Sequence, residues 1–65
     1  MILLDNKGIQ IEELEQILII EPCRIRCLIK QGVIEVKGKD FHVCSLTDRD
    51  LTIKGKVMAV ELDER

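Results

Sequence analysis

The sequence is poor in aromatic residues and in proline. Tryptophan and tyrosine are absent, Phe41 is the one aromatic residue, and Pro22 is the one proline. Without aromatic rings the chain offers no platform on which nucleic-acid bases or sugars could stack. The net charge of −2 also argues against a surface built to neutralise phosphates. No apolar run approaches the roughly 20 residues that a membrane-spanning helix needs.

Targeting signals are also missing from the sequence. The start, MILLDNKG, lacks the basic region and the long apolar region of a signal peptide. Neither end carries a lipidation motif. Three cysteines, an odd number without an export signal, favour reduced thiols. We therefore expect a cytoplasmic protein, with a peripheral position at a membrane as a further option.

The length of 65 residues predicts a single small domain over residues 1–65. A chain of this size buries only about 60% of its unfolded surface, so its core is thin. The composition, 46% hydrophobic and 34% charged, is that of a globular protein. Below roughly 70–80 residues, natural scaffolds usually depend on a disulfide, a metal or a partner chain.

One phrase occurs almost twice: VIEVKGKDFHV around Gly38 and DLTIKGKVMAV around Gly55. In each copy, apolar residues occupy every second position up to a Gly-Lys pair. Beyond this pair the alternation resumes, but the apolar residues change from even to odd positions or the reverse, which we call reversed parity. A two-residue hairpin at each Gly-Lys pair explains this reversal. The hairpins pair Val36 with Phe41, Ile34 with Val43, Ile53 with Met58 and Leu51 with Val60. A glycine bulge that swings one long strand onto a second surface predicts the same reversal and remains the alternative.

Further turns divide the rest of the chain. A hairpin at Gln31-Gly32 sets Ile29 opposite Ile34, DNKG closes a hairpin near the start, and SLTDRD is a polar loop. The segment IEELEQILII is interpreted as a strand with an irregular start, or with one helical turn near residues 12–16, and Pro22 ends it. The sequence therefore predicts an all-β fold. Its form is a small antiparallel meander of short strands, as an open sheet or a small barrel or sandwich, with the strand–Gly–strand unit used twice.

The alternation divides the apolar residues between two faces. We expect one face to form the core, with Ile25, Cys27, Ile29, Ile34, Val36, Phe41, Val43, Leu51, Ile53, Met58, Val60 and Leu62. The opposite face is interrupted by Leu28, Val33, Val57 and Ala59. A second, partly apolar face on a domain with a thin core predicts an interaction surface and a homo-oligomer.

Residues that could carry chemistry are few. Cys23, Cys27, His42 and Cys44 are the available soft metal ligands. On a strand Cys23 and Cys27 would lie about 13 Å apart, too far for one ion. His42 and Cys44 share a strand face, yet no acidic residue is placed to orient them for nucleophilic catalysis. We expect no metal, no cofactor, no small-molecule substrate and no enzymatic activity.

The repeated lysines Lys37, Lys39, Lys54 and Lys56 could form a basic strip for an anionic partner. Lysines at turns and sheet edges more often keep a small sheet soluble.

The stretch from Arg24 to Leu62 resembles the YabP/YqfC family of sporulation proteins. The resemblance lies in the glycines Gly32, Gly38 and Gly55, which we expect at turns, in the alternating strands around them, and in a polar loop containing Leu46-Thr47. The closing Val60-Glu61-Leu62 also fits, and IEELEQILIIEP resembles the preceding strand. The family implies spore envelope or coat assembly, no known catalytic residues, and association with membrane proteins.

Two functions follow as hypotheses. The first is a non-enzymatic assembly or scaffold module of sporulation that acts through self-association and a protein partner, with a membrane protein as one candidate. The second is a small β-barrel module that binds nucleic acid or another anion through Lys37, Lys39, Lys54 and Lys56. The acidic net charge and the scarcity of aromatic residues disfavour the second, so we expect no nucleic-acid partner.

Overall fold

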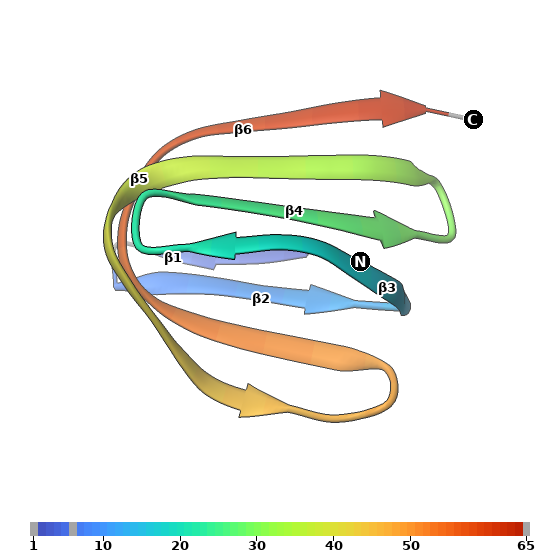
Figure 1. The fold of residues 1–65 in the computed structure, drawn as a ribbon, viewed down its shortest axis with the longest axis horizontal. Helices are drawn as coiled ribbons and strands as arrows, with labels where there is room; N and C mark the ends of the chain where they lie inside the picture. Colours follow the sequence, from blue (N-terminus) through green and yellow to red (C-terminus); the bar gives the residue numbers. More distant parts are fainter. Residues whose placement is uncertain (1, 6, 65) are drawn as a thin grey trace.

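A computed structural model of the protein describes residues 2–5 and 7–64, which form six β-strands (Figure 1). The strands are β1 (Ile2–Asp5), β2 (Gly8–Glu12), β3 (Leu14–Glu21), β4 (Arg24–Ile29), β5 (Gly32–Leu46) and β6 (Asp50–Glu64). They make one antiparallel sheet in the order β1-β2-β6-β5-β4-β3. The predicted all-β, antiparallel fold is confirmed. Among these residues no helix is long and apolar enough to cross a membrane.

The two repeated phrases form two long strands, not two hairpins. β5 and β6 each have 15 residues and pair with each other at both ends. Val36 lies opposite Val60, and Val43 lies opposite Ile53. The prediction of hairpins at Gly38 and Gly55 is therefore wrong, and the alternative with bulges is correct. A bulge reverses parity just as a hairpin does, because it inserts one unpaired residue and turns the following side chains to the other face.

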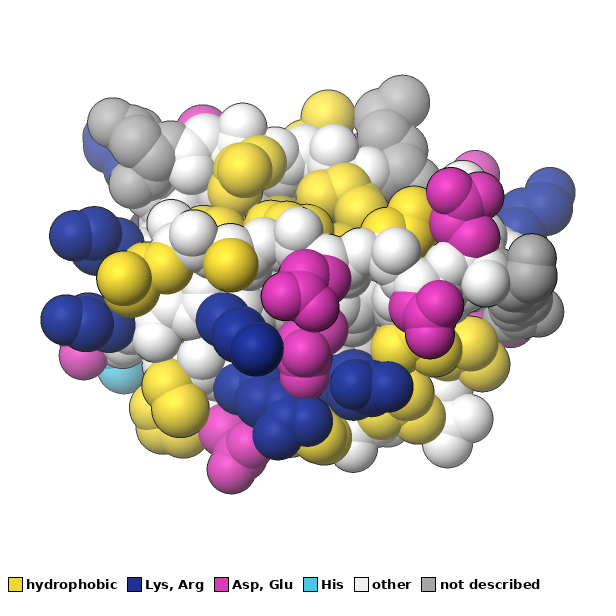
Figure 2. All heavy atoms as spheres, turned by 90° about the horizontal axis from the view of Figure 1, so that it is seen from above, with side chains coloured by type: hydrophobic (Ala, Val, Ile, Leu, Met, Phe, Trp, Pro, Cys, Tyr) yellow, Lys and Arg dark blue, Asp and Glu magenta, His cyan; other side chains and the backbone are white. Residues whose placement is uncertain are grey.

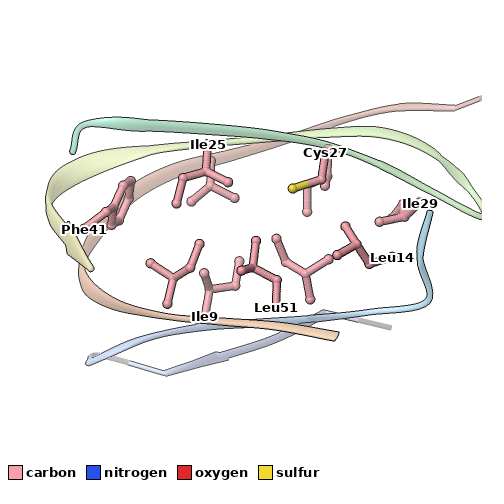
Figure 3. Close-up of a cluster of buried hydrophobic side chains, with 11 residues drawn as sticks. Ile9, Leu14, Ile25, Cys27, Ile29, Phe41 and Leu51 are labelled. Carbon is pink, nitrogen blue, oxygen red and sulfur yellow. The ribbon is translucent and has the colours of Figure 1, made fainter. Parts of the chain in front are cut away.

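The bulges fold the sheet onto itself into two layers. Layer A contains β3, β4, residues 32–37 of β5 and residues 59–64 of β6. Layer B contains β1, β2, residues 42–46 of β5 and residues 50–54 of β6. Figure 3 shows the core between the layers, with Ile25 and Cys27 on one side and Ile9 and Leu51 on the other. The core residues are Ile9, Ile11, Leu14, Ile25, Cys27, Ile29, Ile34, Val36, Phe41, Leu51 and Ile53.

Phe41 packs at the bend between the two glycines of the repeated phrase. A Cβ atom on Gly38 would lie 2.6 Å from Cζ of Phe41, and one on Gly55 would lie 2.7 Å from its Cδ1. Gly55 also has a positive φ of 145°, which L side chains rarely adopt. The phrase is repeated because both strands cross the same bend and both need room for this ring.

The bend is tied to the neighbouring turns by backbone hydrogen bonds. Gly38 N–H donates to the Cys23 carbonyl at 3.0 Å and Phe41 N–H donates to the Pro22 carbonyl at 2.9 Å. On the other strand, Gly55 N–H donates to the Lys7 carbonyl at 3.0 Å. The bend therefore has a fixed geometry although it interrupts the ladder.

The predicted core needs correction at four positions. Val43, Met58, Val60 and Leu62 were expected inside and are 44%, 62%, 37% and 44% exposed. They lie on the halves of β5 and β6 that have a strand on one side only, so the opposite layer covers them incompletely. Conversely, Ile9, Ile11 and Leu14 are buried although the expected core face did not include them.

The other predicted turns are confirmed in outline. Two residues, Lys30 and Gln31, connect β4 to β5, so the turn lies one residue earlier than expected. The predicted pairing of Ile29 with Ile34 is therefore wrong: Ile29 lies opposite Gly32. β1 pairs with β2 across DNKG, of which Asn6 lies outside the described residues. β3 begins irregularly, with φ of 62° at Glu13 and two register shifts, and no helical turn forms at residues 12–16. The loop between β5 and β6 spans residues 47–49.

Candidate interaction surface

Four strand segments pair with another described strand on one side only. These are β1 and β3 at the ends of the sheet order, residues 42–46 of β5 and residues 56–64 of β6. Among residues 2–5 and 7–64, the large apolar side chains that are exposed all lie on these segments: Leu3, Leu4, Leu18, Ile20, Val43, Leu46, Met58, Val60 and Leu62. None of them lies on β2 or β4, which have neighbours on both sides. Free backbone groups beside apolar side chains are the features on which another strand can dock.

The outer face of layer A carries a cluster of charges around Glu35. Arg24 Nε lies 2.6 Å from Glu35 Oε1, Arg26 Nη1 lies 3.6 Å from the same oxygen, and Lys37 Nζ lies 4.0 Å from Oε2. The hydrogen bond from Arg24 lowers the pKa of Glu35, and the neighbouring positive charges lower it further. Figure 2 shows basic and acidic side chains interleaved on one side of the view and apolar side chains beside them.

The predicted interaction face is divided by the structure. Leu28 and Val33 are direct cross-strand partners on the outer face of layer A and are half-buried. Ala59 lies on the same face opposite Lys37 and is exposed. Val57, by contrast, lies beyond the bulge and packs against the core. Three of the four residues therefore share a face, and whether that face binds a partner stays a prediction.

The glycines predicted at turns occupy two kinds of position. Gly32 is the first residue after the turn between β4 and β5. Gly38 and Gly55 lie inside long strands at the bend, not in hairpin loops.

Three of the four lysines of the predicted basic strip lie close together at the bend. Lys39 lies directly opposite Lys56, and Lys54 lies directly opposite His42. Lys7 joins them through the hydrogen bond from Gly55 N–H to its carbonyl. Lys37 instead points to Glu35 on the outer face of layer A.

The cysteines and the histidine do not converge. Cys27 is buried, whereas Cys23 and Cys44 are exposed, and burial raises the pKa of Cys27 to about 11. Cys44 Sγ lies 3.7 Å from the His42 carbonyl oxygen. No group of three or more potential metal ligands occurs among residues 2–5 and 7–64. The buried thiol is a small apolar core side chain, as the strand parity predicted.

Three grooves on the surface are shallow and open. The first, of about 400 Å³, runs along Leu3, Gln10 and Thr52. The second, of about 460 Å³, is lined mainly by charged residues near Glu13, and the third, of about 250 Å³, lies between Arg26 and Asp63. Neither His42 nor a cysteine lines any of these three grooves.

Exposed residues of β6, together with Val43 on β5, are parts of this surface that sequence reasoning missed. Met58, Val60 and Leu62 alternate as core residues do, so alternation alone predicts that they lie in the core. Alternation shows which residues share a face but not whether another strand covers the edge.

These features define a class: a small antiparallel β domain, folded at a glycine-lined bend, whose exposed apolar side chains follow its free strand edges. A family model described as the YabP family matches residues 1–65, and the chain belongs to the YabP family. The resemblance inferred from the glycines and the alternation is thus confirmed over the whole chain. No curated protein and no solved structure matches it.

Proposed function

We propose that this domain is a non-enzymatic assembly module of sporulation. It associates with itself and with a protein partner, a membrane protein being one candidate, during formation of the spore envelope or coat. Membership of the YabP family is consistent with a sporulation-related role. The observation that carries the proposal is the concentration of exposed large apolar side chains on the free strand edges. A small domain gains stability when such edges are covered by another chain.

Sedimentation equilibrium of the purified protein over a concentration series tests the self-association. The expected result is an average mass that rises from monomer to a defined oligomer as the concentration increases. A well-folded protein that remains a monomer throughout the series would contradict it.

A second candidate function is the binding of an anionic ligand at the bend. It is favoured by one observation, the direct opposition of Lys39 to Lys56 beside Lys54 and Lys7. The net charge of −2 and the burial of Phe41 disfavour a nucleic-acid ligand in particular. An electrophoretic mobility shift with oligonucleotides that weakens with salt, and that Lys54→Gln reduces, would support this function. The absence of any shift at low salt would exclude oligonucleotides.

A further inference from the structure

The free edge of β6 differs from the other three in its regularity. Proteins protect exposed edges by making the strand short or by interrupting it with bulges. β1 has only 4 residues, β3 contains two register shifts, and the end of β5 is interrupted by shifts between Lys39/His42 and Val43/Ser45. Residues 59–64 of β6 pair with β5 without any shift. Over residues 59–64 this edge has neither device, and its one bulge, at Met58, lies before that stretch.

Two like-charge pairs lie beside this edge. Glu61 lies directly opposite Glu35, and Lys56 lies directly opposite Lys39. Direct opposition of like charges destabilises a sheet. The arginines Arg24 and Arg26 compensate Glu35, but no described residue forms an ion pair with Glu61, Lys56 or Lys39. These charges on β6 are therefore available to opposite charges from another molecule.

We propose that two copies of this chain pair antiparallel through the free edges of β6, about a two-fold axis that passes at Val60. The proposal rests on the self-association in the proposed function and identifies its surface. Val60 then lies opposite Val60 of the second copy, and Leu62 lies opposite Met58. These side chains, which are 37%, 44% and 62% exposed in the single chain, cover one another. The layers A of the two copies join into one continuous sheet.

The same register brings opposite charges together. Ala59 faces Glu61 of the second copy, and Lys37 is the cross-strand neighbour of Ala59. Lys37 opposite Ala59 is followed by Gly38 opposite Val57, so Met58 is the extra residue of a bulge. Because Met58 is an extra residue, the pairing beyond it shifts by one. Lys56 then lies opposite Asp63 of the second copy, on the outer face. Lys56 thus gains a neighbour of opposite charge, and Glu61 faces an alanine whose other cross-strand neighbour is Lys37.

The two-fold registers shifted by one or two residues towards the end of β6 are less favourable. An axis at Glu61 would set this carboxylate against its own copy, and an axis at Leu62 would set Glu61 against Asp63. The view in Figure 2, from above Figure 1, looks onto the side on which the end of β6 lies and shows apolar side chains bordered by charged ones.

A matched pair of lysine substitutions tests which edge is used. Val60→Lys introduces a charge at the proposed axis, and Val43→Lys makes the same change on the free edge of β5, where the valine is 44% exposed. In sedimentation equilibrium, the wild type and Val43→Lys should form the dimer, and Val60→Lys should remain a monomer. Circular dichroism checks that both variants are folded.

A charge exchange tests the register. Lys56→Glu and Asp63→Lys should each raise the dissociation constant of the dimer roughly tenfold, because the two-fold axis doubles the effect of each substitution. The double variant Lys56→Glu/Asp63→Lys should restore the wild-type value. Lys56→Glu removes the repulsion from Lys39 within the chain, so a loss of dimer in this variant does not reflect a damaged fold.

The outcomes separate this inference from the function on which it rests. A wild type that stays monomeric overturns both. A wild type that associates, while Val60→Lys associates equally well, overturns only the pairing through β6. Single charge variants with unchanged dissociation constants, or a double variant without rescue, overturn the register about Val60.

Discussion

Cys27 and the two other cysteines illustrate how the position of a residue in the sheet decides its chemistry. Cys27 lies on β4 with its side chain in the core, and the pKa of its thiol is raised to about 11 because burial disfavours the thiolate. Cys23 and Cys44 are exposed, at the turn before β4 and near the end of β5. Strand alternation already separates Cys27 from the other two, and the fold confirms that it is buried while they are exposed.

Thiol labelling of the folded protein should therefore occur in two phases. With a water-soluble disulfide reagent at mildly alkaline pH, Cys23 and Cys44 should react quickly and Cys27 only when the protein unfolds. The Cys27→Ala variant should lose the slow phase and keep the fast one. Equal rates for all three thiols in the native protein would contradict the burial of Cys27.

Glu35 predicts a dependence of stability on pH. Its pKa is lowered in the folded chain, first by the hydrogen bond from Arg24, so ionisation of this carboxyl favours the fold. The contribution is present above the ordinary value of 4.5 and is lost as the pH falls through the lower pKa of the folded state. Urea unfolding from neutral to acidic pH should show this loss in the wild type, and Glu35→Gln should show less of it.

The matched control for this prediction is Glu61→Gln. Glu61 lies directly opposite Glu35, but it forms no ion pair with another described residue. The acid-side loss of stability of this variant should resemble that of the wild type. An identical pH dependence in the wild type and Glu35→Gln would show that the Arg24 contact contributes nothing measurable.

At the scale of the strand, the bend in β5 and β6 is the element that creates the core. Each strand contributes to layer A on one side of the bend and to layer B on the other, so the core is enclosed by one sheet. The bend depends on Gly55, whose positive φ and contact with Phe41 leave no room for a side chain.

Gly55→Ala should lower the free energy of unfolding by more than about 1 kcal/mol, because alanine combines the strained φ with a clash against Phe41. Lys54→Ala changes the adjacent exposed residue and should stay within about 0.5 kcal/mol of the wild type. Both values come from urea unfolding followed by circular dichroism. Equal effects of the two substitutions would contradict the steric role of Gly55.

At the scale of the whole molecule, the small size of the domain couples stability to association. The 11 buried side chains found in the described part of the chain make a modest core, and a single core below about 70–80 residues rarely supplies more than about 3–5 kcal/mol. Pairing along β6 would add to this, because a partner that binds only the folded state stabilises it.

The thermal midpoint of the wild type should therefore rise by a few degrees with each large increase in protein concentration. The midpoint of Val60→Lys should not depend on concentration, whereas that of Val43→Lys should follow the wild type. Differential scanning calorimetry at several concentrations measures this. A midpoint of the wild type that is independent of concentration would contradict the coupling.

The sequence by itself determined that the chain forms strands and, within each uninterrupted alternating run, which residues share a face. Alternation with a period of two predicted the strands, the buried Cys27 and most of the core, since side chains on a strand must point to opposite sides. The glycines and the polar loop also indicated the YabP family, which the family match confirms.

Only the tertiary structure decided how the two long strands pair. The reversed parity at Gly38 and Gly55 fits a hairpin and a bulge equally well, because each turns the following residues to the other face. The choice between them depends on long-range pairing of β5 with β6, which local sequence does not encode. For the same reason Val60 and Leu62 resembled core residues: an alternating strand has the same pattern whether or not a neighbouring strand covers its edge.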